Sequence, residues 1–382
     1  MRNYGITLHA AILATTVNLT IPTMKWIVTD ALPPASLAQP LSQALQSSAV
    51  ATSQRLSDLC ERFDAHVEPS PVQAFGCTPG ERLLLESLGC PDTSLQVSES
   101  SHPGKPIGAS LAALHAGVSD NGQTVWIAES CSTIISPDRA TLITLPWLQA
   151  TPAQLQALQM AAQDLLGKPG DAIWLQPIDA GRWRVHALFP DHAWLASPAA
   201  VQGKDMGDWW PTETHWKAWR RLLNEIQMCW HEHPVNIERQ EAGEPEINGL
   251  WLYGGGRGWA PSATTDVQWL TTLSESSTRG DWQQWLHDYE SVAQQLIEAA
   301  ADGQSLDQNP IRAAASRSSA ADPGFEIILT GQDRIVRLTP RDRSGSGSGG
   351  ARLVRHLAQR VAPRFFKKTD KPQPWSTWWN SV

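Results

Sequence analysis

The sequence predicts an α/β protein with a mixed sheet flanked by helices. Short apolar runs with the character of buried strands, such as Met24 to Thr29, alternate along the chain with segments of helical periodicity. In the clearest helical segment, Trp216, Trp219, Leu223, Ile226 and Trp230 recur at steps of three and four residues. The 382 residues are 41% hydrophobic and 18% charged, which is typical of a globular chain with two domains or one large one.

The individual elements follow from local signals. Thr78, Pro79 and Glu81 form the start signature of a helix that Gly89 ends, because Thr caps, Pro fits the first turn and Glu completes a capping box. Other helices are expected over 35–63 and 151–166, from a Thr212 cap to Pro234, and over 280–301. Strands are expected over 24–29, 125–128, 140–145, 173–175, 183–189, 325–329 and 334–338, and over 248–258, which runs into a glycine-rich turn.

Composition shifts divide the chain into five parts. They are an extension at 1–23, an N-terminal α/β region at 24–205, a second α/β region at 206–343, a flexible Gly/Ser linker at 344–350 and a basic, Trp-rich tail at 351–382. Met24 opens a better strand than anything before it, so we interpret 1–23 as an upstream extension or a misassigned start rather than a secretion signal.

The cysteines and the apolar runs suggest where the protein works. Five widely spaced cysteines contain no CxxC pair, which favours neither a zinc knuckle nor a disulfide framework and fits a reducing cytoplasm. No run reaches the roughly 18 apolar residues of a membrane span. We therefore predict a cytoplasmic protein without a transmembrane segment.

Charge is distributed unevenly between the body and the tail. The whole chain carries a net charge of −8, yet the tail has seven basic residues against one acid. Cations interleaved with tryptophans suit a nucleic-acid or protein partner. The alternative is a solvated extension, or a tail that folds back on the acidic body, since three exposed indoles would promote aggregation.

A polar block in the second region is the main candidate binding site. Its amide, guanidinium, imidazole and backbone groups suit a small carboxylate or phosphate ligand, and three consecutive glycines let an anion approach the main chain. The alternative is structural, because buried polar groups need partners whatever the function. The candidate ligand-binding residues are Asn224, Glu225, His231, His233, Asn236, Arg239, Asn248, Gly254, Gly255 and Gly256.

This block resembles a known family pattern. His233-Pro234-Val235-Asn236, followed by Arg239, Gly243 and Asn248 to Gly256, is similar to the corresponding block of archaeal-type cofactor-independent phosphoglycerate mutases. From Met24 to about Arg343 the chain looks closer still to the RpfE-type regulatory proteins of proteobacteria, including its Gly76-Cys77-Thr78-Pro79 turn. The resemblance implies a fold of the alkaline-phosphatase-like superfamily.

The resemblance also implies a catalytic site that can be compared with this sequence. Mutases of that superfamily hold two metal ions that clamp the transferring phosphoryl group. Asp30 matches the first metal ligand, and Thr78 or Cys77 stands at the position of the nucleophile. No histidine has an Asp four residues before it, and the Asp191-His192 pair precedes the block. Too few ligands are left for a dinuclear site.

The sequence therefore favours a non-catalytic, mutase-like regulatory or interaction protein that binds a small anionic ligand and has no cofactor. One alternative is a metal-dependent mutase or phosphohydrolase, with Mn or Zn held by Asp30, His231 and His233, together with Asp191 and His192. The other is a nucleic-acid-associated adaptor that acts through the tail.

Overall fold

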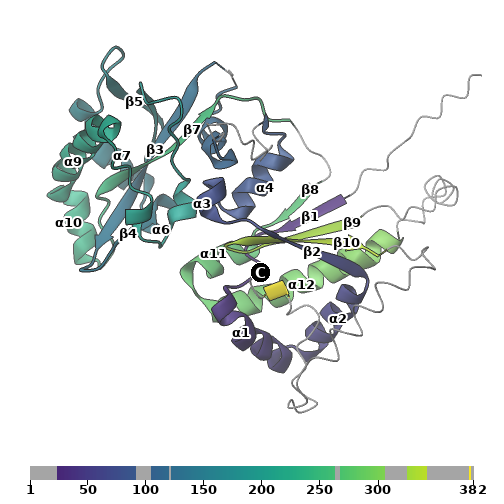
Figure 1. Cartoon of the computed structure of the whole chain (residues 1–382). Coiled ribbons are helices and arrows are strands. Elements are labelled where there is room, and N and C mark those ends of the chain that lie inside the picture. The colour runs from purple at the N-terminus through teal and green to yellow at the C-terminus, as the bar shows by residue number, and fades with distance from the viewer. Residues whose placement is uncertain are drawn as a thin grey trace, which may run out of the picture.

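The protein has two lobes, each built on one five-stranded sheet (Figure 1). The computed structural model describes residues 24–91, 105–119, 122–262, 267–305, 325–341 and 378–379. The predicted extension at 1–23, the linker at 344–350 and the tail apart from Trp378 and Trp379 lie outside these residues, so the partners predicted for the tail stay predictions.

The first lobe confirms the predicted mixed sheet. Its strand order is β2-β10-β9-β1-β8, with β1 parallel to β8 and β9, and β10 antiparallel to β2 and β9. The carboxyl ends of β1, β8 and β9 thus meet at one edge of this sheet. The strands are β1 (Met24–Val28), β2 (Phe63–Pro69), β8 (Val267–Leu270), β9 (Phe325–Thr330) and β10 (Arg334–Pro340).

Helices cover both faces of this sheet. On one face, an apolar stripe of α12 containing Trp285, Tyr289 and Val292 packs against strand residues such as Ile327. On the other face, Leu83 of α4 packs against Ile27, Ile328 and Ile335. The helices concerned are α1 (Ala35–Ser48), α2 (Val50–Glu61), α4 (Pro79–Ser87), α11 (Thr272–Arg279) and α12 (Trp282–Ser305).

The second lobe is built on an antiparallel sheet centred on a long strand, β3, which pairs with β4, β6 and β7. Its strands are β3 (Thr124–Ile135), β4 (Ala140–Thr144), β5 (Ile173–Asp179), β6 (Arg182–Ala187) and β7 (Gly249–Arg257). Its helices and 3-10 turns are α3 (Val72–Phe75), η2 (Ile107–Ser110), α5 (Leu111–His115), α6 (Leu145–Leu148), α7 (Pro152–Ala161), η3 (Gln163–Leu165), α8 (Pro198–Val201), η4 (Met206–Asp208), η5 (Thr214–Trp216), α9 (Lys217–His231) and α10 (Pro234–Glu241).

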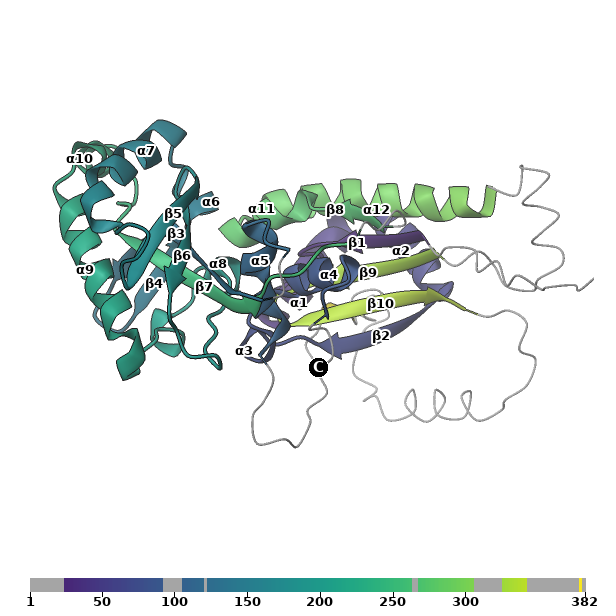
Figure 2. The ribbon, with the colours of Figure 1, turned by 90° about the horizontal axis from the view of Figure 1, so that it is seen from above.

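The two faces of this second sheet have different neighbours. Helices α7 and α9 cover the outer face, where Trp126, Trp219 and Trp230 are buried in one core. The inner face turns toward the first lobe, and there Tyr253 and Trp251 pack with residues of α3 and α5. Viewed from above, α5 lies between the two sheets, and α4 lies over one face of the first sheet (Figure 2).

The second lobe interrupts the first in sequence. Strands β3 to β7 all fall between β2 and β8, so the first sheet takes its strands from both ends of the described chain. The predicted division between residues 205 and 206 falls inside this inserted stretch. No helix among the described residues has the length and apolar character needed to cross a membrane.

Several local predictions differ from the structure. The helix expected over 35–63 is divided into α1 and α2, and Phe63 is the first residue of β2. The glycine-rich segment predicted as a turn is part of β7 and pairs with β3, because small neighbouring residues approach it closely. Pro234, expected only to end a helix, is also the first residue of α10, a position that proline favours. The helix expected from a Thr212 cap begins instead at Lys217, after the η5 turn.

Candidate functional site

Asp30 follows β1 at the carboxyl edge of the first sheet, the place where open α/β sheets bind ligands. Its backbone has a φ of 56°, an unusual left-handed conformation for a residue other than glycine. Two contacts hold it there: its N–H donates to Thr330 Oγ1 at 3.0 Å, and its carbonyl accepts from Trp285 Nε1 at 2.9 Å. The main chain around this predicted metal ligand is therefore firmly positioned.

Thr78 begins α4 next to this edge, so the structure brings the two catalytic candidates into one neighbourhood. A Cβ placed on Gly80 would lie 3.4 Å from Thr29 Cγ2, which shows how closely the first turn of α4 approaches the end of β1. The predicted capping box is confirmed, since Thr78 Oγ1 accepts from Glu81 N at 3.2 Å and Thr78 N donates to Glu81 Oε2 at 2.8 Å.

Glu81 brings a buried carboxyl into this neighbourhood. Ser197 Oγ donates to Glu81 Oε2 at 2.6 Å, which ties the helix start to the second lobe. Burial raises the pKa of Glu81, and the nearby carboxyl of Asp30 raises it further. Burial also raises the pKa of Asp30, while a hydrogen bond to Ser274 opposes that rise. The site thus has two close, poorly solvated carboxyls.

A second polar group lies on the inner face of the second sheet. Glu129 of β3 stands opposite Arg182 of β6, and burial raises the pKa of its carboxyl to about 7, although the Arg182 charge opposes the rise. His115 Nδ1 lies 2.8 Å from the Tyr253 hydroxyl. Burial lowers the pKa of His115 and raises that of Tyr253. Electrostatic effects of Glu81 on both Glu129 and Tyr253 link this group to α4.

The sequence prediction missed this second group. Glu129 ends an apolar strand run, and that isolated acid was the only local sign of it. Its partners come from separate strands and a distant helix, so only the strand pairing brings them together.

The most buried polar residues of the predicted block bind the protein's own main chain. The Asn236 amide donates to Trp230 O and Ile247 O at 2.9 Å, and its oxygen accepts from Ile247 N at 2.9 Å. Arg239 is 1% exposed and donates to Pro245 O at 2.8 Å and to Leu148 O at 2.6 Å. These donors join α10 to the start of β7 and to α6.

Asn248 and His233 have comparable local contacts. Asn248 Oδ1 accepts from Thr133 N at 2.7 Å, and its Nδ2 donates to Thr133 O at 3.0 Å, which extends the pairing of β3. His233 caps α10, with Nδ1 accepting from Val235 N at 3.2 Å.

The remaining side chains of the block lie nearer the surface. His231 Nδ1 is 3.6 Å from Glu246 Oε2, and Glu225 pairs with Arg221 on α9 at 2.9 Å. Asn224 is exposed on the same helix. Anion binding by the block stays a prediction, and a ligand would have to displace several of these contacts.

The three glycines allow backbone to pack closely on β7. Gly254 and Gly255 have φ values of 113° and 101°, which favour glycine. A Cβ on Gly255 would lie 2.5 Å from Ala193 O, and one on Gly256 would lie 2.7 Å from Ala109 O. This close packing accounts for the absence of side chains at all three positions.

The structure does not bring the candidate metal ligands together. Asp30 lies at the edge of the first sheet, whereas His231 and His233 lie at the α9–α10 turn of the second lobe, on its far side (Figure 1). In the described part of the chain, no three His, Cys, Asp or Glu side chains form a group able to hold a metal ion.

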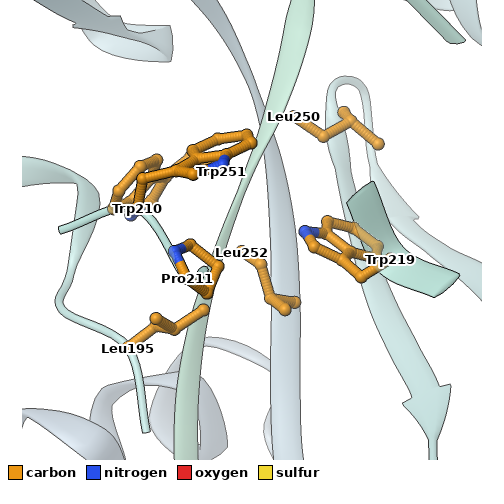
Figure 3. A pocket seen from close by; sticks show the side chains of 7 residues that line it. All are labelled: Leu195, Trp210, Pro211, Trp219, Leu250, Trp251 and Leu252. Carbon is orange, nitrogen blue, oxygen red and sulfur yellow. The ribbon is translucent and has the colours of Figure 1, made fainter. Parts of the chain in front are cut away.

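A shallow hollow in the second lobe offers a different surface (Figure 3). Its lining is apolar and aromatic. Trp251 Nε1 already donates to Ala196 O at 2.9 Å. The hollow contains none of the predicted site residues and offers no charge for an anion. Its lining residues are Leu195, Trp210, Pro211, Trp219, Leu250, Trp251 and Leu252.

Comparisons with known proteins found only distant structural likenesses. No protein-family model and no curated protein matches the chain. Among solved structures, it is similar to a cofactor-independent phosphoglycerate mutase from Thermoplasma acidophilum, with 12% identity and a TM-score of 0.29 over 84% of this chain and 90% of that one. A protein from Pyrococcus horikoshii gives 11% identity and a TM-score of 0.37, over 85% and 90% of the two chains.

Both TM-scores are low, so neither likeness says what this chain binds or catalyses. The mutase shares its family name with the resemblance seen in the sequence block. The RpfE-type resemblance stays a prediction.

Proposed function

We propose that this chain is a non-catalytic, mutase-like protein that acts through binding, as a regulatory or interaction protein. The observation that carries the proposal is that the Thr78 hydroxyl, the candidate nucleophile, is used as a helix cap. This hydroxyl caps α4 within the Thr78–Glu81 box, and the Glu81 carboxyl lies beside it.

The chemistry of phosphoryl transfer explains why this arrangement disfavours catalysis. A threonine hydroxyl becomes a nucleophile when a base or a metal ion activates it, and the transferring group brings several negative charges. In their ionised forms, the nearest carboxyls, Glu81 and Asp30, would repel a phosphate unless cations neutralised them. No described group of three potential ligands supplies a place for such cations.

The test is an assay of phosphoglycerate interconversion by the purified full chain, with Mn²⁺ or Zn²⁺ added. We expect rates equal to those of the Asp30→Asn and Thr78→Val variants and of a no-protein control. Metal-dependent turnover that both variants abolish would contradict the proposal. That result would establish the second candidate, a metal-dependent mutase or phosphohydrolase, which the closeness of Asp30 to the start of α4 favours.

The small anionic ligand predicted for the block can be tested in the same preparation. Isothermal titration with inorganic phosphate and with citrate measures binding directly. Saturable binding that is lost in Asn248→Ala would support a site in the block. Binding that survives Asn248→Ala would place the anion elsewhere. If the titration releases no heat, protein partners remain as the ligand class.

A further inference from the structure

We propose that the first lobe contains a peptide-binding socket, and that its ligand is the chain's own Trp378–Trp379 segment. Residues 341–377 separate these two residues from β10 in the sequence, yet Trp379 is fully buried in the core of the first lobe. The socket is formed by Trp285, Tyr289 and Arg334.

Aromatic side chains supply the apolar part of the socket. The Trp379 ring lies 5.5 Å from the Trp285 ring at an interplanar angle of 73°, and 5.4 Å from the Tyr289 ring at 88°. Edge-to-face pairs of this kind add specificity to the burial of apolar area. Trp285 is itself fully buried, so the bound indole completes a buried cluster of three rings.

Arg334 supplies the polar part and fixes the position of the segment. Its Nη2 donates to Trp379 O at 2.6 Å, and its Nε donates to Trp378 O at 3.3 Å. The guanidinium is 2% exposed, and its Nη1 also pairs with Asp333 at 2.6 Å. A buried guanidinium needs acceptors for its donors, and this segment provides two of them. Recognition through main-chain carbonyls is how proteins bind a peptide in a defined register.

The socket is connected to the candidate site. Trp285, which contacts Trp379 edge to face, donates its Nε1 hydrogen to the Asp30 carbonyl at 2.9 Å. Arg334 Nη2, which binds Trp379, also donates to Pro33 O at 3.0 Å. The two ends of the Asp30–Pro33 loop are thus held by the two residues that bind the segment. Occupation of the socket therefore stabilises the left-handed conformation of Asp30.

The long intervening sequence makes the segment a separable ligand. The effective concentration of a tethered group falls as its linker lengthens, so a free peptide in excess can compete with it. A second chain or a partner with a similar Trp-Trp segment would meet the same chemistry. Release of the tail segment would then change the conformation of the Asp30–Pro33 loop.

The test uses the full chain with a protease site inserted between Gly349 and Gly350. After cleavage, we expect the 351–382 fragment to co-elute with the body in size-exclusion chromatography. Excess synthetic peptide of residues 374–382 should displace it, whereas the same peptide with Trp379→Ala should not. Immediate separation of the fragment would overturn the proposal, as would a fragment that no peptide displaces.

Hydrogen exchange tests the connection to Asp30. In full-length Trp379→Ala, we expect the amides of residues 30–32 to exchange at least tenfold faster than in the wild type, and the 374–382 peptide to restore slow exchange. The control is Trp174→Ala, because Trp174 stacks on His186 in the second lobe, with ring centroids 3.7 Å apart. Unchanged exchange in Trp379→Ala would refute the connection. Exchange that increases throughout the chain and is not restored by peptide would show a permanent core element instead of a ligand.

Discussion

Replacing Asn236 by alanine separates a structural role for the polar block from a ligand-binding role. Asn236 is fully buried and makes three hydrogen bonds between the end of α9, α10 and the start of β7. If these bonds are its purpose, Asn236→Ala lowers the stability of the protein. If it is kept for an anion, the substitution weakens ligand binding and leaves stability nearly unchanged.

The magnitude follows from the groups left behind. Trp230 O keeps a second donor, because His233 N lies 3.1 Å from it. Ile247 is fully buried, and both its N–H and its carbonyl lose the partner that Asn236 provides. Each buried group left unsatisfied costs about 1–3 kcal/mol. The expected loss is therefore about 2–6 kcal/mol in the free energy of unfolding.

Urea unfolding followed by tryptophan fluorescence measures this loss. The matched control is Asn224→Ala, since Asn224 belongs to the same predicted block but is exposed on α9. It should remain within about 0.5 kcal/mol of the wild type. A similarly small change in Asn236→Ala would refute the structural reasoning.

Three further substitutions test other parts of the structure. Thr78→Ala removes the cap of α4 and should cost about 1 kcal/mol in thermal unfolding, while Thr78→Ser should retain most of that stability; equal losses would contradict the capping role. Glu129→Gln should raise the melting temperature at pH 8 but not at pH 4. Folding raises the pKa of the Glu129 carboxyl from about 4.5 to about 7, so this group stabilises the protein below pH 4.5 and loses that contribution as the pH rises through 7. Parallel pH profiles of the variant and the wild type would contradict this. Gly256→Ala places a Cβ 2.7 Å from Ala109 O and should lower the free energy of unfolding by about 1–3 kcal/mol. The control Gly117→Ala meets no atom within 4 Å and should cost only the strain of its φ of 62°. A larger loss in Gly117→Ala than in Gly256→Ala would contradict the packing argument.

Local signals in the sequence predicted local structure well. The strand at Met24 and the capping box at Thr78 and Glu81 each depend on a few neighbouring residues, and both are confirmed. The glycines of β7 misled the prediction, because glycine disfavours strands. Their place in a strand depends on Ala109 and Ala193, which approach from distant parts of the chain.

The candidate site depends on contacts that no short stretch of sequence contains. The family resemblance singled out Asp30 and Thr78, but their closeness follows from the packing of α4 beside the end of β1. The cluster of Glu129, Arg182 and Tyr253 appears only once β3, β6 and β7 are paired. The socket for Trp379 likewise combines α12 with β10. Folding back of the tail is one of the alternatives that the sequence left open. Trp378 and Trp379 do fold back onto the first lobe.

Metal binding at Asp30 tests the central claim most directly. Electron paramagnetic resonance during titration of the full chain with Mn²⁺ measures free and bound ions, and Asp30→Asn identifies binding that depends on this carboxylate. A non-catalytic protein predicts only weak binding that is the same in both forms. Two tightly bound ions per chain, lost in Asp30→Asn, would contradict it and establish a metal-dependent enzyme.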